Sequence, residues 1–165
     1  MECYIKNYPR PQFVRKEWED LNGGWAFAFD GGDSGERECW FKSFPSGMKI
    51  NVPFTYETVL SGINDETPRE IVWYERDLPT RPEAGKRAAL HFEGSDYETK
   101  VWVNGIFIGI HTGGYARFSF DITGALAEVG ANKLTVRVRD AKDIRQPRGK
   151  QRWTDYSFGC WYTQT

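Results

Sequence analysis

The stretch "KVWVNGIFIGIHTGGYARFSF", residues 100–120, decides the fold. In its first part Val101 and Val103 fall on one face of an extended chain and Trp102 falls on the other, which is the period-two pattern of a β-strand. The Asn-Gly pair at 104–105 follows directly. Both residues tolerate the positive φ of a type I′ turn, which joins two antiparallel strands with only two residues. The sequence therefore predicts a β-hairpin.

The two-residue turn predicts three facing pairs across this hairpin: Val103 with Ile106, Val101 with Ile108, and Trp102 with Phe107. Apolar residues lie on both faces, which is typical of strands inside a sandwich rather than at its edge. The remainder, "HTGGYARF", contains two glycines that allow tight turns. We interpret it as a structural turn.

Four other segments alternate in the same way: "GGWAFAFD" (23–30), "EIVWYERDL" (70–78), "RAALHFEG" (87–94) and "KLTVRVRD" (133–140). One short helix is predicted over "DITGALAEVG" (121–130), with Thr123 as its N-cap and Gly130 at its end. Segments 31–53 and 140–165 read as long and irregular. Many short strands with Gly- and Pro-rich turns predict an all-β jelly-roll β-sandwich with one short connecting helix.

Composition narrows the class of protein. The formal net charge of −1 over 165 residues argues against a nucleic-acid partner. No apolar run approaches the ~20 residues that a membrane-spanning helix needs. Cys3, Cys39 and Cys160 lack the spacing of a zinc or redox motif, and the N-terminal segment lacks the pattern of a signal peptide. We therefore expect a cytoplasmic protein, with a processed, secreted protein as the alternative.

Several stretches together resemble a known family: "LNGGWAFAFD" (21–30), "INVPFTYETVLSGI" (50–63), "VWYERD" (72–77), "LHFEGSDYETKVWVNG" (90–105), "GIHTGGYARFSFDIT" (109–123), "NKLTVRVRD" (132–140) and "PRGKQRW" (147–153). In this order they are similar to the N-terminal domain of family 2 glycoside hydrolases. The loop "PRGKQ" and the ending "CWYTQT" resemble the β-galactosidase and β-glucuronidase types more than the mannosidases.

The resemblance implies a galactose-binding-domain-like sandwich, often called the sugar-binding domain. In the family it precedes an immunoglobulin-like domain and a (β/α)8 barrel whose two glutamates perform retaining hydrolysis. A barrel needs ~250 residues of its own. We therefore expect residues 1–165 to form a single non-catalytic domain that lacks the barrel and ends before its last strand or strands.

The parent protein implied by the resemblance hydrolyses O-glycosyl bonds of a carbohydrate substrate, and this chain alone is expected to be inactive. Its role would be to pack on the barrel, shape the mouth of the active site and support a homo-oligomer. An autonomous carbohydrate-binding module with its own sugar site is the alternative function.

The stretch "RQPRGKQRWTDYSFGCWY" (145–162) is the best candidate for a functional loop because it combines basic and aromatic side chains, which can contact the hydroxyls and the C–H faces of sugars. The resemblance implies that Asp155 contacts the substrate together with the barrel, flanked by Lys150, Gln151 and Trp153. Secondary candidates are His111, Tyr115 and Tyr162. The alternative is that the loop only forms an interface between domains.

No catalytic residue, cofactor or metal site is predicted. Asp96 and Glu98 are two residues apart on one face of a predicted strand, within the range of a glycosidase carboxylate pair. Nothing in the sequence raises the pKa of either one, so we expect no catalysis from them. Asp30, Asp33 and Glu36 could bind calcium, but they lack the spacing of an EF-hand loop.

Overall fold

The computed structural model describes residues 15–45, 47–78, 83, 85–147 and 149–151. This part of the chain forms the strands β1 (Gly23–Phe29), β2 (Met48–Val52), β3 (Ile71–Leu78), β4 (Ala89–Phe92), β5 (Glu98–Val103), β6 (Ile106–Thr112), β7 (Phe118–Asp121) and β8 (Asn132–Arg139). Two single-turn 3-10 helices, η2 (Val59–Ser61) and η3 (Thr123–Ala125), connect them. Among these elements no helix has the length and hydrophobicity needed to cross a bilayer.

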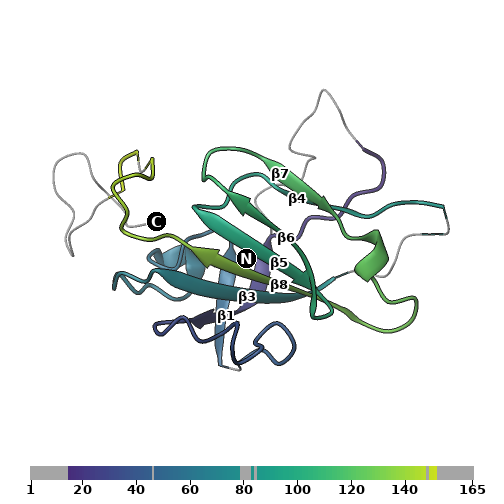
Figure 1. The fold of residues 1–165 in the computed structure, drawn as a ribbon, viewed down its shortest axis with the longest axis horizontal. Helices are drawn as coiled ribbons and strands as arrows, with labels where there is room; N and C mark the ends of the chain where they lie inside the picture. Colours follow the sequence, from purple (N-terminus) through teal and green to yellow (C-terminus); the bar gives the residue numbers. More distant parts are fainter. Residues whose placement is uncertain (1–14, 46, 79–82, 84, 148, 152–165) are drawn as a thin grey trace.

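The strands form two antiparallel sheets. The larger has the order β2-β1-β3-β8-β5-β6, and the smaller consists of β4 and β7. In Figure 1 the small sheet lies beside the β5–β6 end of the large one, and β6 contacts β7. The predicted all-β sandwich is confirmed.

Apolar side chains from both sheets fill the space between them. The strand residues of this core include Trp25 and Phe27 from β1, Val101 and Val103 from β5, Leu134 and Val136 from β8, and Leu90 from β4. These are the residues that the alternating patterns place on the inner face. Each strand therefore turns its apolar set toward the partner sheet, as the period of two requires.

The outer face of the large sheet is covered by residues 30–44. Within this segment Phe41 stacks on Trp102 with ring centroids 5.3 Å apart, and Trp102 stacks on Trp73 at the same separation. Thr135 and Arg137, which alternation alone places on a solvent-facing side, are consequently buried, with 1% and 2% of their surface exposed. The covering segment turns a half-exposed sheet into one that is buried on both faces.

The predicted hairpin is present as β5 and β6, with one correction to its register. Val103 pairs with Ile106, and Trp102 pairs with Phe107, as predicted. Val101 pairs with Gly109 instead of Ile108, because a β-bulge interrupts the ladder between Val101 and Trp102. A Cβ at Gly109 would come within 2.5 Å of the Phe120 ring of β7, so the bulge places a glycine where the small sheet approaches most closely.

The prediction that both hairpin strands lie inside the sandwich is half wrong. β5 lies between β8 and β6, but β6 is the edge strand of the large sheet within the described part of the chain. Phe107 and Ile110 on β6 are accordingly 53% and 49% exposed. β6 has apolar residues on both faces although it is an edge strand, and its sequence pattern therefore resembled that of an interior strand.

The predicted helix over 121–130 is wrong in type and length. Only η3 forms there, and its N-cap position is Ile122 instead of Thr123. The Thr123 hydroxyl donates to Asp121 Oδ1 and accepts from the backbone N–H of Ala88, so it joins the turn to β4. Gly124 inside so short a segment also makes helix nucleation unfavourable.

Two strands were missed by the pattern reading. β2 falls inside segment 31–53, which reads as irregular, and β7 begins at Phe118, the last residue of the stretch interpreted as a turn. Both are short edge elements, with β2 paired to β1 and β7 paired to β4. Their extended conformation depends on these partners more than on their own periodicity.

Candidate functional site

The candidate loop begins where β8 ends. Residues 140–147 and 149–151, hereafter the post-β8 segment, lead away from Arg139 at one end of the sandwich (Figure 1). Gln151 fixes the far end of this segment, because its Nε2 donates to Asp96 Oδ2 at 3.1 Å and to Asp140 Oδ2 at 3.4 Å. Asp96 lies just before β5, so these bonds tie the segment to the sandwich.

The loop between β6 and β7 meets the post-β8 segment at the same end. A Cβ at Gly149 would lie 2.8 Å from the Tyr115 hydroxyl, so the phenol lies directly over that glycine. A Cβ at Gly114 would lie 2.5 Å from the Asp96 carboxylate, so only a glycine lets that carboxylate reach Gln151. The stretch "HTGGYARF" therefore contributes to the packing of the candidate loop.

His111 has a structural environment. Its ring stacks on Phe118 with centroids 3.9 Å apart, and its Nε2 lies 3.1 Å from the Gly113 carbonyl oxygen. These contacts support the turn between β6 and β7.

The structure brings Tyr115, Lys150 and Gln151 to one end of the molecule. Tyr115 and Lys150 are exposed there, while Gln151 is half-buried. Trp153, Asp155 and Tyr162 lie outside the described residues. Their assignment to substrate contact, like that of the other four candidates, stays a prediction.

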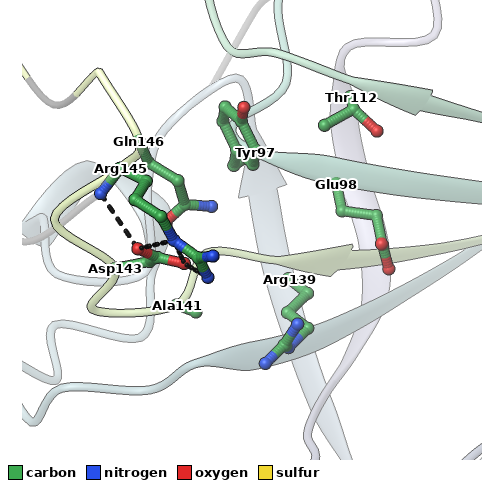
Figure 2. A pocket seen from close by; sticks show the side chains of 8 residues that line it. All are labelled: Tyr97, Glu98, Thr112, Arg139, Ala141, Asp143, Arg145 and Gln146. Atoms are coloured by element: carbon green, nitrogen blue, oxygen red, sulfur yellow. Dashed lines mark hydrogen bonds and ion pairs between the residues drawn. The ribbon is translucent and has the colours of Figure 1, made fainter.

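An open cavity of about 450 Å³ lies beside the post-β8 segment. Figure 2 shows its lining: Tyr97, Glu98, Thr112, Arg139, Ala141, Asp143, Arg145 and Gln146. Of these, the sequence analysis considered Glu98 as a carboxylate and Arg145 and Gln146 as part of the candidate loop, and none of them as part of a cavity. Asp143 favours a local turn after β8, but that signal indicates a turn and not a cavity.

The charged groups of the cavity are held by one another and by neighbours. The Arg145 guanidinium donates from Nη2 to Asp143 Oδ2 at 2.6 Å and from Nε to Asp143 Oδ1 at 2.9 Å. These hydrogen bonds raise the pKa of Arg145 above its ordinary value. Arg139 donates to Glu70 Oε1 from Nε and Nη2. Glu98 accepts from Nη1 of the buried Arg137 at 3.2 Å.

The two carboxylates considered for catalysis, Asp96 and Glu98, have different positions and different partners. Glu98 begins β5, whereas Asp96 precedes the strand, so they do not share one strand face as the sequence suggested. Asp96 is bonded to Gln151 and Glu98 to Arg137. Both serve to hold segments of the fold together.

The carboxylates considered for calcium also have protein partners. Asp30 accepts hydrogen bonds from the backbone N–H groups of Ser34 and Gly35 and from Trp73 Nε1. Asp33 and Glu36 form ion pairs with Arg137. Within the described residues, no group of three or more His, Cys, Asp or Glu side chains is placed to hold a metal ion.

Burial raises the pKa of Asp30, but the hydrogen bonds from Ser34, Gly35 and Trp73, together with the positive charge of Arg137, outweigh burial and hold that pKa below its ordinary value. Asp30 is therefore ionised at neutral pH. Its charge anchors the start of the segment that covers the large sheet.

Known relatives resemble this chain over most of its length. It is 35% identical over 130 residues to a β-galactosidase of Thermoanaerobacter pseudethanolicus, a match that covers 76% of this chain and 16% of the relative. It is 33% identical over 132 residues to the β-glucuronidase of Canis lupus familiaris, covering 70% of this chain and 19% of that one. The chain thus spans about a fifth of the length of these relatives.

Solved structures agree in fold. The β-glucuronidase of Lactobacillus rhamnosus superposes with a TM-score of 0.64 at 28% identity, over 74% of this chain and 21% of the other. A β-glucuronidase of Ruminococcus gnavus superposes with a TM-score of 0.67 at 23% identity, over 77% of this chain and 23% of the other. The second likeness shows the fold alone.

The family profile described as "Glycosyl hydrolases family 2, sugar binding domain" matches residues 18–155. This range includes both sheets, the segment over the outer face and the post-β8 segment. The chain therefore belongs to the sugar-binding domain family of the family 2 glycosyl hydrolases.

Proposed function

We propose that this chain serves as the non-catalytic N-terminal domain of a retaining β-glycosidase of the β-galactosidase or β-glucuronidase type. The observation that carries the proposal is the family match over residues 18–155, combined with relatives of both kinds that are about five times longer. The catalytic groups would reside in the part of the enzyme that this chain does not contain.

In this role the domain packs on the catalytic barrel and shapes the mouth of its active site. Gln151 is bonded to Asp96 and Asp140, and it lies four positions before Asp155. We assign substrate contact to Lys150, Gln151, Trp153 and Asp155, acting together with groups of the barrel.

The partners follow from the same role. They are an immunoglobulin-like domain and a barrel in the same polypeptide, a carbohydrate substrate, and a second copy of the enzyme in a homo-oligomer. The exposed apolar side chains of β6, Phe107 and Ile110, offer one surface that such a neighbour could cover.

The test begins with the coding sequence downstream of Thr165. A barrel with two glutamates supports the proposal, and a stop codon at that point overturns it. The full-length protein should hydrolyse the nitrophenyl β-galactoside or β-glucuronide, whereas the 165-residue chain should hydrolyse neither.

Two matched variants of the full-length protein then test the loop. Asp155→Ala should lower kcat/KM by about tenfold or more, because a charged contact to the substrate is lost. Asp77→Ala removes an exposed aspartate of β3 that is paired with Lys133, and should leave kcat/KM unchanged. Equal effects of the two variants would remove Asp155 from the site.

A further inference from the structure

We propose that β6 pairs edge to edge with β6 of a second copy of this chain, in antiparallel orientation about a two-fold axis. The pairing rests on the proposed function for the existence of a homo-oligomer, and it names the surface through which that oligomer forms. It involves no hydrolysis, so it is measured on the 165-residue chain itself.

The edge of β6 lacks the features that protect an edge strand. β6 reads Ile-Phe-Ile-Gly-Ile-His-Thr, which contains no Lys, Arg, Asp, Glu or Pro, and none of its 7 residues is buried. The open backbone groups of an edge strand are a template for another strand, and native proteins blunt such edges with charges, prolines or covering segments. An uncharged, accessible edge therefore indicates that another strand covers it.

Two other edges in the same molecule show the contrast. At the opposite border of the large sheet, β2 has the exposed Lys49. Asn51 Nδ2 of β2 also donates to the carbonyl oxygen of Leu60 at 3.3 Å, so η2 lies against this strand. In the small sheet, β7 ends in the charged Asp121. β6 has neither a charge of its own nor such a covering segment among the described residues.

The small sheet occupies only the inner side of β6. β7 pairs with β4 and not with β6. It contacts β6 through side chains, because the Phe120 ring approaches Gly109 and the Phe118 ring stacks on His111. The hydrogen-bonding edge of β6 and its outer side therefore stay open in the described part of the chain.

Two apolar side chains of β6 lie on that outer side. Phe107 packs beside Trp102 with ring centroids 5.6 Å apart, and it is 53% exposed. Ile110 pairs with Lys100, whose ammonium group reaches Glu36 of the segment that covers the outer face, and it is 49% exposed. Phe107 and Ile110 thus form an exposed apolar pair along the open edge.

This pair is self-complementary in one antiparallel register. A two-fold axis between Ile108 and Gly109 places Phe107 opposite the partner's Ile110, and by symmetry Ile110 lies opposite the partner's Phe107. Side chains that face each other across antiparallel strands are in contact, with Cβ atoms about 4.5–5.5 Å apart. A single kind of contact, made twice, therefore covers both exposed side chains of each copy.

The same register brings opposite charges together at both ends of the pairing. Lys42 lies over the hairpin turn, because its Cγ would be 3.1 Å from a Cβ at Gly105. At the other end of β6, Thr112 pairs with Glu98, whose side chain is 30% exposed. Gly105 faces the partner's Thr112, so Lys42 lies near the partner's Glu98. Lys42 forms no ion pair within the described residues, and this complementarity favours a second copy as the occupant.

The experiment is sedimentation velocity of the 165-residue chain over a dilution series from sub-micromolar to hundreds of micromolar, with near-ultraviolet circular dichroism to verify folding. We expect a reversible monomer–dimer equilibrium. Phe107→Lys and Ile110→Glu should each raise the dissociation constant by about tenfold or more, since a charge would then face an apolar group at the centre of the pairing. Val129→Lys is the matched control, because Val129 is an apolar residue that is 90% exposed and lies outside β6.

Mixing the two variants tests the register. In a mixed pair, Lys at position 107 of one copy faces Glu at position 110 of the other, while the remaining Phe107–Ile110 contact is unchanged. An equimolar mixture of Phe107→Lys and Ile110→Glu should therefore form a heterodimer, although each variant alone is monomeric at the same concentration. A non-specific apolar association would not recover in this way.

Hydrogen exchange on the unmodified chain gives a second test that does not depend on how the variants fold. Backbone amides of β6 should exchange more slowly in concentrated than in dilute samples, whereas those of β2 should not change. A folded chain that stays monomeric throughout the series would overturn the pairing, and so would β6 amides whose exchange does not depend on concentration. Equal effects of Val129→Lys and Phe107→Lys, or a mixture of folded variants that remains monomeric, would also overturn it. A monomeric chain leaves the proposed glycosidase role intact, and a stop codon after Thr165 leaves the pairing intact, so the two proposals fail separately.

Discussion

Arg137 Nη2 lies 2.7 Å from Asp33 Oδ1, and this ion pair joins residues that are 104 positions apart in the sequence. Arg137 is in the centre of the large sheet, on β8 between β3 and β5. Its side chain is 3% exposed, and it also contacts Glu36 and Glu98. The pair therefore holds the segment 30–44 against the outer face of the sheet.

Arg137→Ala should destabilise the chain by about 3 kcal/mol, because a buried charge network loses its central cation. The partly exposed carboxylates are hydrated again in the variant. The loss of unfolding free energy therefore stays at the low end of the range for broken buried ion pairs. The measurement is the free energy of unfolding in urea. Arg139 is on the same strand as Arg137 and forms an exposed ion pair with Glu70. Arg139→Ala should therefore cost at most about 1 kcal/mol. Equal losses would contradict the role assigned to Arg137.

The lowered pKa of Asp30 predicts how the free energy of unfolding changes with pH in the acid range. Because its pKa is lower in the folded chain than in the unfolded one, its ionised form contributes stability that is present above the unfolded value of about 4 and is lost as the pH falls through the folded value. Asp30→Asn should cost about 1–3 kcal/mol at pH 7, since an amide cannot accept from all three donors. The difference between the two proteins should shrink on titration from pH 6 to pH 3. A constant difference would exclude Asp30 as the titrating group.

The raised pKa of Tyr56 predicts how the free energy of unfolding changes with pH in the alkaline range. Burial raises its pKa to about 12, and its hydroxyl accepts from the backbone N–H of Arg69 at 3.1 Å. The raised pKa means that its contribution to stability is complete below the unfolded value of about 10 and is lost between that value and about 12. Tyr56→Phe should cost about 1 kcal/mol at pH 7. Its unfolding free energy should also fall less steeply between pH 10 and pH 12; an unchanged slope would refute the assignment.

Gly114 tests the anchoring of the candidate loop. In Gly114→Ala the new methyl group would occupy the place of the Asp96 carboxylate, so the hydrogen bond from Gln151 should be lost. The side-chain NH₂ resonances of Gln151 report this bond directly. We expect a destabilisation of about 1–3 kcal/mol from the overpacking. Gly124→Ala is the control, because a Cβ there meets no atom within 4 Å. Unshifted Gln151 resonances in Gly114→Ala would contradict this account of the site.

The sequence by itself determined the strands whose pattern repeats on a period of two. Val101 and Val103, followed by an Asn-Gly turn, are enough to predict a hairpin and its inner face, because alternation and turn chemistry are local properties. The family was recognisable for the same reason, since its stretches occur in order along the chain. Asp96 and Glu98 could likewise be identified as candidate carboxylates. Their separate partners, Gln151 and Arg137, could not be predicted from the sequence.

Only the tertiary structure decided what depends on neighbours remote in sequence. The bulge pairs Gly109 with Val101, at the place where Phe120 of the other sheet approaches most closely, and Arg137 is buried because residues 30–44 return across its face. The cavity beside the post-β8 segment is assembled from the ends of β5, β6 and β8. Side chains from separate strands acquire a common surface only when the sheet aligns them, so no local pattern could predict it.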